Sequence, residues 1–593
     1  MSRRADHRHR PVLGLGALAA ALAGCYSGAG SGSDGDDAGT GGSGADSADT
    51  GADSADDTGS AACAESSSIS PLRRLTAAQY RNTLRDLFAP AGFDVEAPEA
   101  AADELDRIPV DDGEGSFGIL DGRVSDLHAR AYYRLADRLA DLTVADPDRL
   151  RAVAGECAGS TMPDDACIDA FLDDLGLRAY RRPLTDDERA KLHDIADTSP
   201  DGTEAWRSLV FMVLMSPQFL YHAELEGEGD DTQYDLDGYA LASRLSFHFW
   251  QSMPDAELLA AAADGSLLTD AGYVAQLDRV FDDPRTQATV DRFYDEWLQL
   301  GWMTTFPSTP AFTTFAQGTT IGQADADHLQ AAQDEIHALV RHFTFDEDGT
   351  FADLLLTDLS LTTSPHLAQL YGVAPWDGQS EPPRMPAGQR AGMLTRVAFL
   401  LTGNEESHPV HRGAAVRDRI MCAELPQPDP TMLPPGALDQ PPVTGDQTTR
   451  QRYEAKTADG ACVGCHQAIN PIGFVLEGYD ALGRHRTEET IIDGVTGEIL
   501  ATLPLDTAAA PNLAGDDTII DDGIALSQQV VDSGESERCF ATQYFRATFG
   551  RTETEDDTCV LDTVQAELTD NASMRQALRT IALAATFRAR RVM

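Results

Sequence analysis

One pentapeptide constrains this chain more than any other feature: Cys462-Val463-Gly464-Cys465-His466. On a helix, two cysteines separated by two residues lie about one turn apart, and here a histidine follows the second directly. This spacing is the attachment signature of c-type haem, because two thiols on one turn reach the two vinyl groups on one porphyrin edge. His466 would then lie beneath the iron as proximal ligand. The pentapeptide predicts one covalent haem c, held by Cys462 and Cys465 and ligated by His466.

Two other interpretations of the pentapeptide stay open. A structural zinc site normally needs four ligands from two separated pairs, and the sequence has no second Cys-x-x-Cys or His pair near His466. A redox-active dithiol or a plain disulfide is the other alternative. The following histidine and the lack of a thioredoxin-like βαβ pattern argue against it.

The sixth iron ligand has no spacing argument behind it. The candidates are His411, His485 and Met421, with His408 and Met432 also upstream. A closed iron favours electron transfer, whereas an open sixth position permits peroxide or O₂ chemistry.

Three further residues are candidates for contacts around a haem. The carbonyl of Pro471, or of a neighbour, is placed to accept from the second ring nitrogen of His466. Arg484 and Arg486 are candidate partners for the haem propionates, because guanidinium groups bind carboxylates bidentately. As an alternative, both arginines are solvated cations in an acidic chain.

The N-terminus has the pattern of an exported protein. Residues 1–24 combine a basic start with a small-residue apolar stretch, too short to span a bilayer, and are expected to be a signal peptide. Leu22-Ala23-Gly24-Cys25 resembles a bacterial lipobox, which implies lipidation of Cys25; a plain signal peptide is the alternative. Residues 25–62 lack the apolar side chains that folding requires and are expected to form an acidic, flexible tether. Tyr26 directly after Cys25, by resemblance to lipoprotein sorting, favours the outer membrane.

Composition excludes one class of partner. The 593 residues carry 45 Lys+Arg against 97 Asp+Glu, a formal charge of −52, which repels nucleic acid and anionic lipid surfaces. No stretch after the signal peptide reaches the roughly 18 apolar residues of a membrane helix. We therefore expect no nucleic-acid partner and membrane contact only through the N-terminal lipid.

Six cysteines remain once Cys25, Cys462 and Cys465 have roles, and in an exported protein an even remainder predicts three disulfides. Six cysteines allow 15 connectivities, so sequence distance is the only guide. It favours Cys157 with Cys167 and Cys539 with Cys559, which leaves Cys63 with Cys422. As an alternative, one or both of the last two are buried thiols.

The body of the chain is predicted to be mainly α, multidomain and poor in strands. Capping boxes at Thr76 and Thr185 each open an apolar stretch with helical spacing. A hairpin is predicted around Gly494 to Leu505. The expected modules are a helical one at 63–160, a small helical one at 161–230, a central one at 231–375, the Cys-x-x-Cys-His module at 386–495 and a helical one at 496–593. The helices expected in the middle of the chain are 206–225, 236–250, 255–263, 286–300, 328–345, 389–401 and 414–421.

Several motifs together resemble one family. They are Leu72-Arg73-Arg74-Leu75-Thr76, Arg178-Ala179-Tyr180-Arg181-Arg182-Pro183-Leu184-Thr185, Ser216-Pro217-Gln218-Phe219-Leu220-Tyr221, Leu241-Ala242-Ser243-Arg244-Leu245-Ser246, Pro409-Val410-His411-Arg412-Gly413, Asn470-Pro471-Ile472-Gly473-Phe474 and Phe545-Arg546…Gly550-Arg551. They resemble exported bacterial proteins built from the domains of unknown function 1587, 1595, 1592, 1588 and 1585. The resemblance implies a secreted or surface protein with a c-type haem and no established reaction. One departure is His408, where the family more often has Ser or Thr.

Three functions follow as hypotheses. The first is a surface-anchored mono-haem protein that passes single electrons to an unidentified redox partner. The second is a haem peroxidase or oxygenase acting on an extracellular substrate through an open iron. The third is a non-catalytic protein that binds an extracellular polymer. No hydrolase motif is present: the sequence has no nucleophile elbow, His-Glu-x-x-His or phosphate loop.

Overall fold

A computed structural model describes residues 72–97, 100–109, 111, 117, 124–222, 224, 233–317, 326–425, 436–458, 460 and 462–591. These residues all belong to one compact unit, Thr58–Met593. The predictions for the signal peptide, for lipidation of Cys25, for the tether and for pairing of Cys63 lie outside the described residues.

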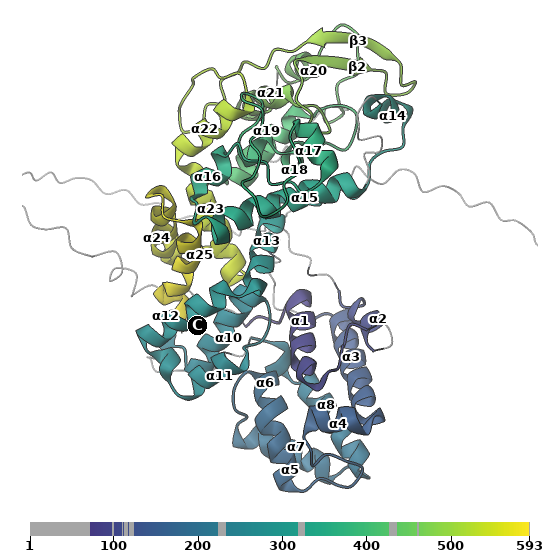
Figure 1. The fold of residues 1–593 in the computed structure, drawn as a ribbon, viewed down its shortest axis with the longest axis vertical. Helices are drawn as coiled ribbons and strands as arrows, with labels where there is room; N and C mark the ends of the chain where they lie inside the picture. Colours follow the sequence, from purple (N-terminus) through teal and green to yellow (C-terminus); the bar gives the residue numbers. More distant parts are fainter. Residues whose placement is uncertain are drawn as a thin grey trace, which may run out of the picture. The chain divides into compact units, whose positions relative to one another are not determined.

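The chain is mainly helical, as predicted (Figure 1). Its first helices are α1 (Ala77–Phe88), η2 (Ala89–Ala91), α2 (Ala102–Leu105), α3 (Asp126–Ala145), α4 (Pro147–Ala154), α5 (Asp165–Phe171), the π-helical turn η3 (Leu172–Gly176), α6 (Leu177–Tyr180), α7 (Asp186–Asp197), α8 (Gly202–Met215) and α9 (Pro217–Leu220). Both predicted capping boxes are confirmed, at Thr76 before α1 and at Thr185 before α7. These helices enclose a core of their own that includes Trp206 of α8.

The central elements are β1 (Gln233–Asp235), α10 (Gly238–Trp250), α11 (Ala256–Ala263), η4 (Ser266–Leu268), α12 (Asp270–Asp282), α13 (Pro284–Leu298), α14 (Pro310–Ala316), α15 (Ala326–Arg341), the π-helical turn η5 (His342–Asp346), α16 (Phe351–Leu356) and α17 (Pro365–Tyr371). Four of them, α10, α11, α13 and α15 with η5, match the expected helices 236–250, 255–263, 286–300 and 328–345 to within a few residues at each end, whereas α12, α14, α16 and α17 were not expected. Asp255 caps α11, since its carboxylate accepts from the backbone N–H of Leu258 at 2.9 Å.

The later elements are η6 (Met393–Thr395), α18 (Val397–Leu400), α19 (Pro409–Ala415), the π-helical turn η7 (Val416–Ile420), α20 (Thr449–Thr457), α21 (Val463–Val475), η9 (Leu476–Gly478), β2 (Glu488–Ile492), β3 (Ile499–Pro504), α22 (Gly523–Ser533), α23 (Glu535–Phe549), η10 (Glu555–Asp557), α24 (Thr558–Thr569), α25 (Met574–Leu583), α26 (Ala585–Arg588) and β4 (Ala589–Arg591). The predicted hairpin is confirmed: β2 and β3 pair antiparallel, and β2 begins earlier than expected, at Glu488. A second antiparallel pair joins β1 to β4.

The expected helix 389–401 is wrong, because the structure has only η6 and α18 there. Gly392 has φ +66°, and a Cβ on it would lie 1.6 Å from the carbonyl oxygen of Leu355. Arg396 is extended in its backbone and fully buried, and its guanidinium pairs with Glu335 at 2.9 Å. Tertiary contacts therefore override the helical pattern of this segment.

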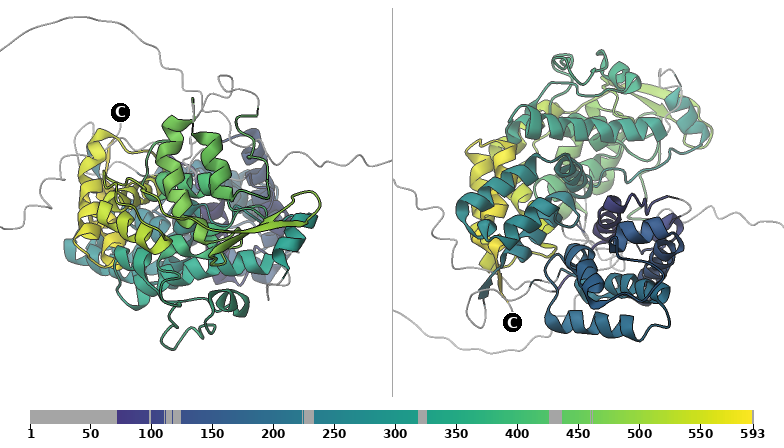
Figure 2. Two further views of the ribbon diagram at one scale, coloured as in Figure 1. Left: turned by 90° about the horizontal axis from the view of Figure 1, so that it is seen from above. Right: turned by 60° about the horizontal axis from the view of Figure 1, so that its bottom comes forward.

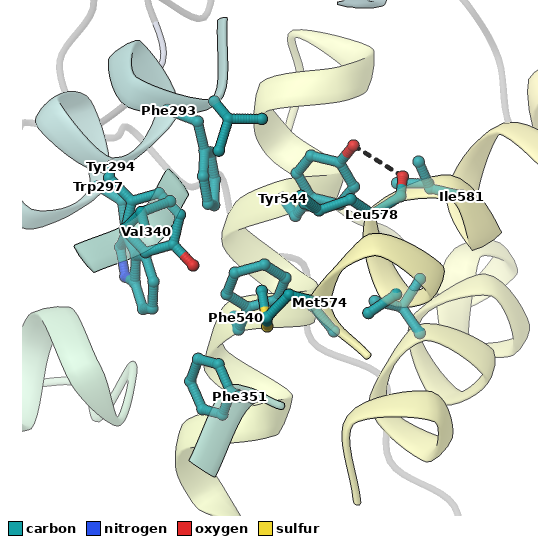
Figure 3. Close-up of a cluster of buried hydrophobic side chains, with 14 of the residues drawn as sticks. Phe293, Tyr294, Trp297, Val340, Phe351, Phe540, Tyr544, Met574, Leu578 and Ile581 are labelled. Carbon is teal, nitrogen blue, oxygen red and sulfur yellow. Dashed lines mark hydrogen bonds between the residues drawn. The ribbon is translucent and has the colours of Figure 1, made fainter. Parts of the chain in front are cut away.

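One hydrophobic core is shared by central and C-terminal helices. Phe293 and Trp297 of α13 lie against Phe540 and Tyr544 of α23, and the Phe293 and Phe540 rings are 5.5 Å apart (Figure 3). The Tyr544 hydroxyl donates to the carbonyl of Leu578 at 2.9 Å. Figure 2 shows from two further directions that the yellow C-terminal helices lie against the teal central ones. Segments some 250 residues apart in sequence are thus one packing unit.

The disulfides correct two of the predicted pairings. Cys157 pairs with Cys167, as predicted. Cys422, however, pairs with Cys539, which overturns both the Cys539–Cys559 and the Cys63–Cys422 pairings. The reason is tertiary: α23 lies along η7 and brings the two Cα atoms to 5.1 Å, within disulfide range. Cys559 is itself disulfide-bonded.

In the part of the chain that the structure describes, no helix has both the length and the apolar character needed to span a bilayer.

Candidate functional site

The pentapeptide forms the start of α21. Cys462 is the N-cap residue, Cys465 lies in the first turn, and the His466 backbone N–H donates to the Cys462 carbonyl at 3.1 Å. Both cysteines are partly exposed and neither is disulfide-bonded. The helix therefore presents two thiols on one turn near the protein surface.

His466 is held by a chain of hydrogen bonds that fixes its tautomer. The Thr457 hydroxyl donates to the Tyr453 carbonyl at 2.7 Å, and its oxygen accepts from the Asn470 side-chain NH₂, also at 2.7 Å. The Asn470 amide oxygen therefore faces Nδ1 of His466, at 2.9 Å. Since that oxygen can only accept, Nδ1 carries a proton, and in the neutral imidazole Nε2 is the nitrogen with the lone pair.

The surface beside the thiols is open. Val463 is 41% exposed, and no atom lies within 4 Å of where a Cβ on Gly464 would be. The two thiols and the unprotonated Nε2 of His466 are the donors that a c-type haem uses. The residues present therefore fit the group that the pentapeptide predicts.

Two glycines set the position of α21. A Cβ on Gly473 would lie 1.8 Å from the Pro409 carbonyl oxygen, and one on Gly413 would lie 2.1 Å from the Ile469 carbonyl oxygen. Helices α19 and α21 thus cross in direct backbone contact, which larger residues at either position would prevent. The helix that carries the cysteines is in this way fixed against its neighbour, and α20 also packs against both (Figure 1).

His408 caps helix α19. Its Nδ1 accepts from the backbone N–H of His411 at 3.1 Å, the contact that a Ser or Thr hydroxyl makes at other N-caps. Burial, followed by the charge of His411, lowers the pKa of His408 to about 4. His408 is therefore neutral at pH 7 and able to accept this bond, which explains how it can replace Ser or Thr.

The candidates for the sixth ligand lie in three different places. His411 packs against Trp302 and His408, with ring centroids 5.9 and 6.0 Å apart. Met421 is 6% exposed and belongs to the large hydrophobic core. His485 packs against Tyr479. Tyr479 follows the C-terminal end of α21, whereas the thiols lie at the N-terminal end of that helix. The structure does not bring these three side chains together, and the identity of a sixth ligand stays a prediction.

Arg484 and Arg486 both have carboxylate partners within the protein. Arg484 pairs with Asp480, and its guanidinium lies 4.5 Å from the centroid of the Phe315 ring. Arg486 pairs with the fully buried Glu477 at 3.1 Å. Contact of these two arginines with haem propionates remains a prediction. Both guanidinium groups already have anionic partners within the protein.

Asn470 was missed by sequence reasoning, which expected the carbonyl of Pro471 or a neighbour to hold His466. The signal was available: residues four apart on a helix are neighbours, and Asn470 follows His466 by four. What the sequence did not contain was the partner that orients the amide, Thr457 on another helix.

The described residues contain no group of three or more His, Cys, Asp or Glu side chains arranged to hold a metal ion.

Fold and site together define a mainly helical protein with a Cys-x-x-Cys-His helix fixed among α19 and α20. Four family models match the chain, each described as a protein of unknown function. They are DUF1587 over residues 73–145, DUF1595 over 167–224, DUF1592 over 236–373 and DUF1588, named PSCyt3, over 390–489. The chain belongs to the family built from these domains. A closing 1585 domain and the lipoprotein form remain predictions. No curated protein and no solved structure matches the chain.

Proposed function

We propose that this chain is a c-type mono-haem protein that transfers single electrons. Cys462 and Cys465 would hold the haem covalently, and His466 would be its proximal ligand. The observation that carries the proposal is the pair of thiols on one turn, beside an imidazole whose Nε2 is made available by Asn470. Haem, when bound, supplies a reversible one-electron couple at its iron.

The surrounding residues support this role. The bond from Nδ1–H of His466 to Asn470 orients the ring and raises the basicity of Nε2, as such contacts do for metal-bound histidines. The domain that contains the pentapeptide matches a family whose name, PSCyt3, associates it with cytochrome c. We also propose export, lipidation at Cys25 and anchoring in the outer membrane, where the haem would exchange electrons with a redox partner.

The test is a pyridine haemochrome assay on the full chain, matured in a periplasm with cytochrome c maturation. We expect a covalent haem that survives acid–acetone extraction, and its loss or conversion to single attachment in Cys465→Ser. Gly464→Ala is the matched control: it changes the residue directly before Cys465 but meets no atom within 4 Å, and it should retain haem fully.

Colourless wild-type protein, or full covalent attachment in Cys465→Ser, would overturn the proposal. The ferric spectrum then distinguishes the class of reaction. A low-spin spectrum agrees with electron transfer, whereas a high-spin one would contradict it and favour peroxide chemistry at an open iron.

A further inference from the structure

A second site lies far from the pentapeptide in sequence. A pocket of about 120 Å³ is formed by the start of the described chain together with α10, α13 and α23. Aromatic rings line it, among them Phe247, Phe293, Tyr544 and Phe549. Figure 3 shows Phe293 and Tyr544 beside one another at one edge of the core. An engineered apolar cavity of about 150 Å³ accommodates benzene, so this volume suits a single ring.

The pocket also contains several guanidinium groups, and most have partners. Arg244 binds Glu224 through two hydrogen bonds of 2.7 and 2.8 Å. Arg292 donates to Glu296 at 2.6 Å. Arg74, which also lines the pocket, pairs with Asp111 at 2.7 Å.

Arg73 is different. Among the described residues, its side chain has neither a hydrogen bond nor an ion pair. The guanidinium lies over Gly550, where a Cβ would be 2.7 Å from its Nη1. Gly550 follows α23 with φ +59° and so leaves the space that the guanidinium occupies. The backbone thus makes room for a guanidinium that Glu224 influences through its charge, while the Glu224 carboxylate itself is hydrogen-bonded to Arg244.

Arg73 remains charged in this pocket. Burial lowers its pKa to about 10, Glu224 opposes that shift, and Arg244 and Arg551 add to it. Two histidines also line the pocket, and burial followed by the charge of Arg73 lowers the pKa of each: His248 to about 3, and His222 well below its ordinary value. Both are neutral at pH 7, so Arg73 is the group that an anion would neutralise.

Three guanidinium groups, those of Arg73, Arg244 and Arg590, act on the one carboxylate of Glu224. Such an excess of positive charge at a partly buried site is unfavourable, and proteins keep one where it serves a ligand. A guanidinium presents two parallel N–H groups, which match the two oxygens of a carboxylate. The aromatic walls provide the complementary surface for a ring. We infer that this pocket binds a small carboxylate that carries one apolar ring, with the carboxylate on Arg73 and the ring among Phe247, Phe293 and Phe549.

The test uses isothermal titration calorimetry on the full chain, with benzoate as probe and benzamide as its uncharged counterpart. We expect saturable benzoate binding at least tenfold tighter than benzamide binding. Arg73→Gln should weaken benzoate binding at least tenfold and leave benzamide unchanged. Arg134→Gln, on the exposed face of α3, is the control and should bind benzoate as the wild type does.

Thermal unfolding gives an independent readout. Because Arg73→Gln removes one of three cations that share the carboxylate of Glu224, it should raise the Tm of the ligand-free protein and abolish the further rise that benzoate causes in the wild type. A lower Tm would mean that Arg73 has a structural anionic partner, for example a carboxylate of this chain, and would overturn the inference.

The inference is also overturned if benzoate does not bind saturably, or if benzoate and benzamide bind equally. These measurements do not depend on haem. They can be made on haem-loaded protein and on the Cys465→Ser variant, so failure here is distinguishable from failure of the proposed electron transfer.

Discussion

At the residue scale, the site depends on which way one amide points. Asn470 has its oxygen toward His466 because its NH₂ is taken by Thr457, whose own proton is used on the Tyr453 carbonyl. A ring nitrogen that donates to an acceptor makes the other nitrogen a stronger ligand for ferric iron. Asn470 is therefore a positioning residue for His466.

Asn470→Ala should leave haem attached and raise its reduction potential. If the hydrogen bond stabilises only the ferric state, by about 1 kcal/mol, its loss raises the one-electron reduction potential by about 40 mV. The measurement is a spectroelectrochemical titration, with Gln467→Ala as control, since Gln467 is exposed on the same helix. An unchanged potential in Asn470→Ala would show that the amide does not act on His466.

At the element scale, helix α19 begins at a cap that can titrate. A histidine nitrogen accepts a hydrogen bond only when it is unprotonated, and His408 holds the first turn of α19 through Nδ1. Its folded-state pKa of about 4 lies below the ordinary value of 6.5. The unfolded chain therefore binds more protons between these values, and the stabilisation present above pH 6.5 is lost as the pH falls toward 4.

His408→Ser should remove this dependence and keep the cap, because a serine hydroxyl accepts at every pH. The measurement is thermal unfolding at pH 7 and at pH 5. Between these pH values the Tm of the wild type should fall further than the Tm of His408→Ser. His366→Ser, at an exposed position of α17, controls for the loss of a histidine. Equal losses in wild type and His408→Ser would contradict the role of the cap.

At the scale of the whole molecule, the Cys422–Cys539 disulfide links the end of η7 to α23 across 117 residues. A cross-link over a loop of that length lowers the entropy of the unfolded chain and so stabilises the folded protein by about 5 kcal/mol. The corresponding stabilisation is about 3 kcal/mol for the 10-residue separation of Cys157 and Cys167.

Cys422→Ser/Cys539→Ser should therefore lower the apparent Tm more than Cys157→Ser/Cys167→Ser. Differential scanning calorimetry of both double variants, matured under the same conditions, makes the comparison. An equal or larger decrease for the local pair would show that the long-range bridge adds little to the native protein.

The sequence by itself determined the features that need only neighbouring residues. The capping boxes at Thr76 and Thr185, the helices α10, α11, α13 and α15, the hairpin and the thiol spacing of the pentapeptide are local in this sense, because helical geometry relates residues three and four apart. Cys157 with Cys167 belongs to the same class.

Only the tertiary structure decided what depends on distant segments meeting. It placed Cys422 beside Cys539, broke the expected helix at Gly392, set the amide of Asn470 through Thr457 and left the Arg73 cation over Gly550. None of these features produces a periodic pattern in the sequence. Each depends on packing between elements that are far apart along the chain, at no regular interval.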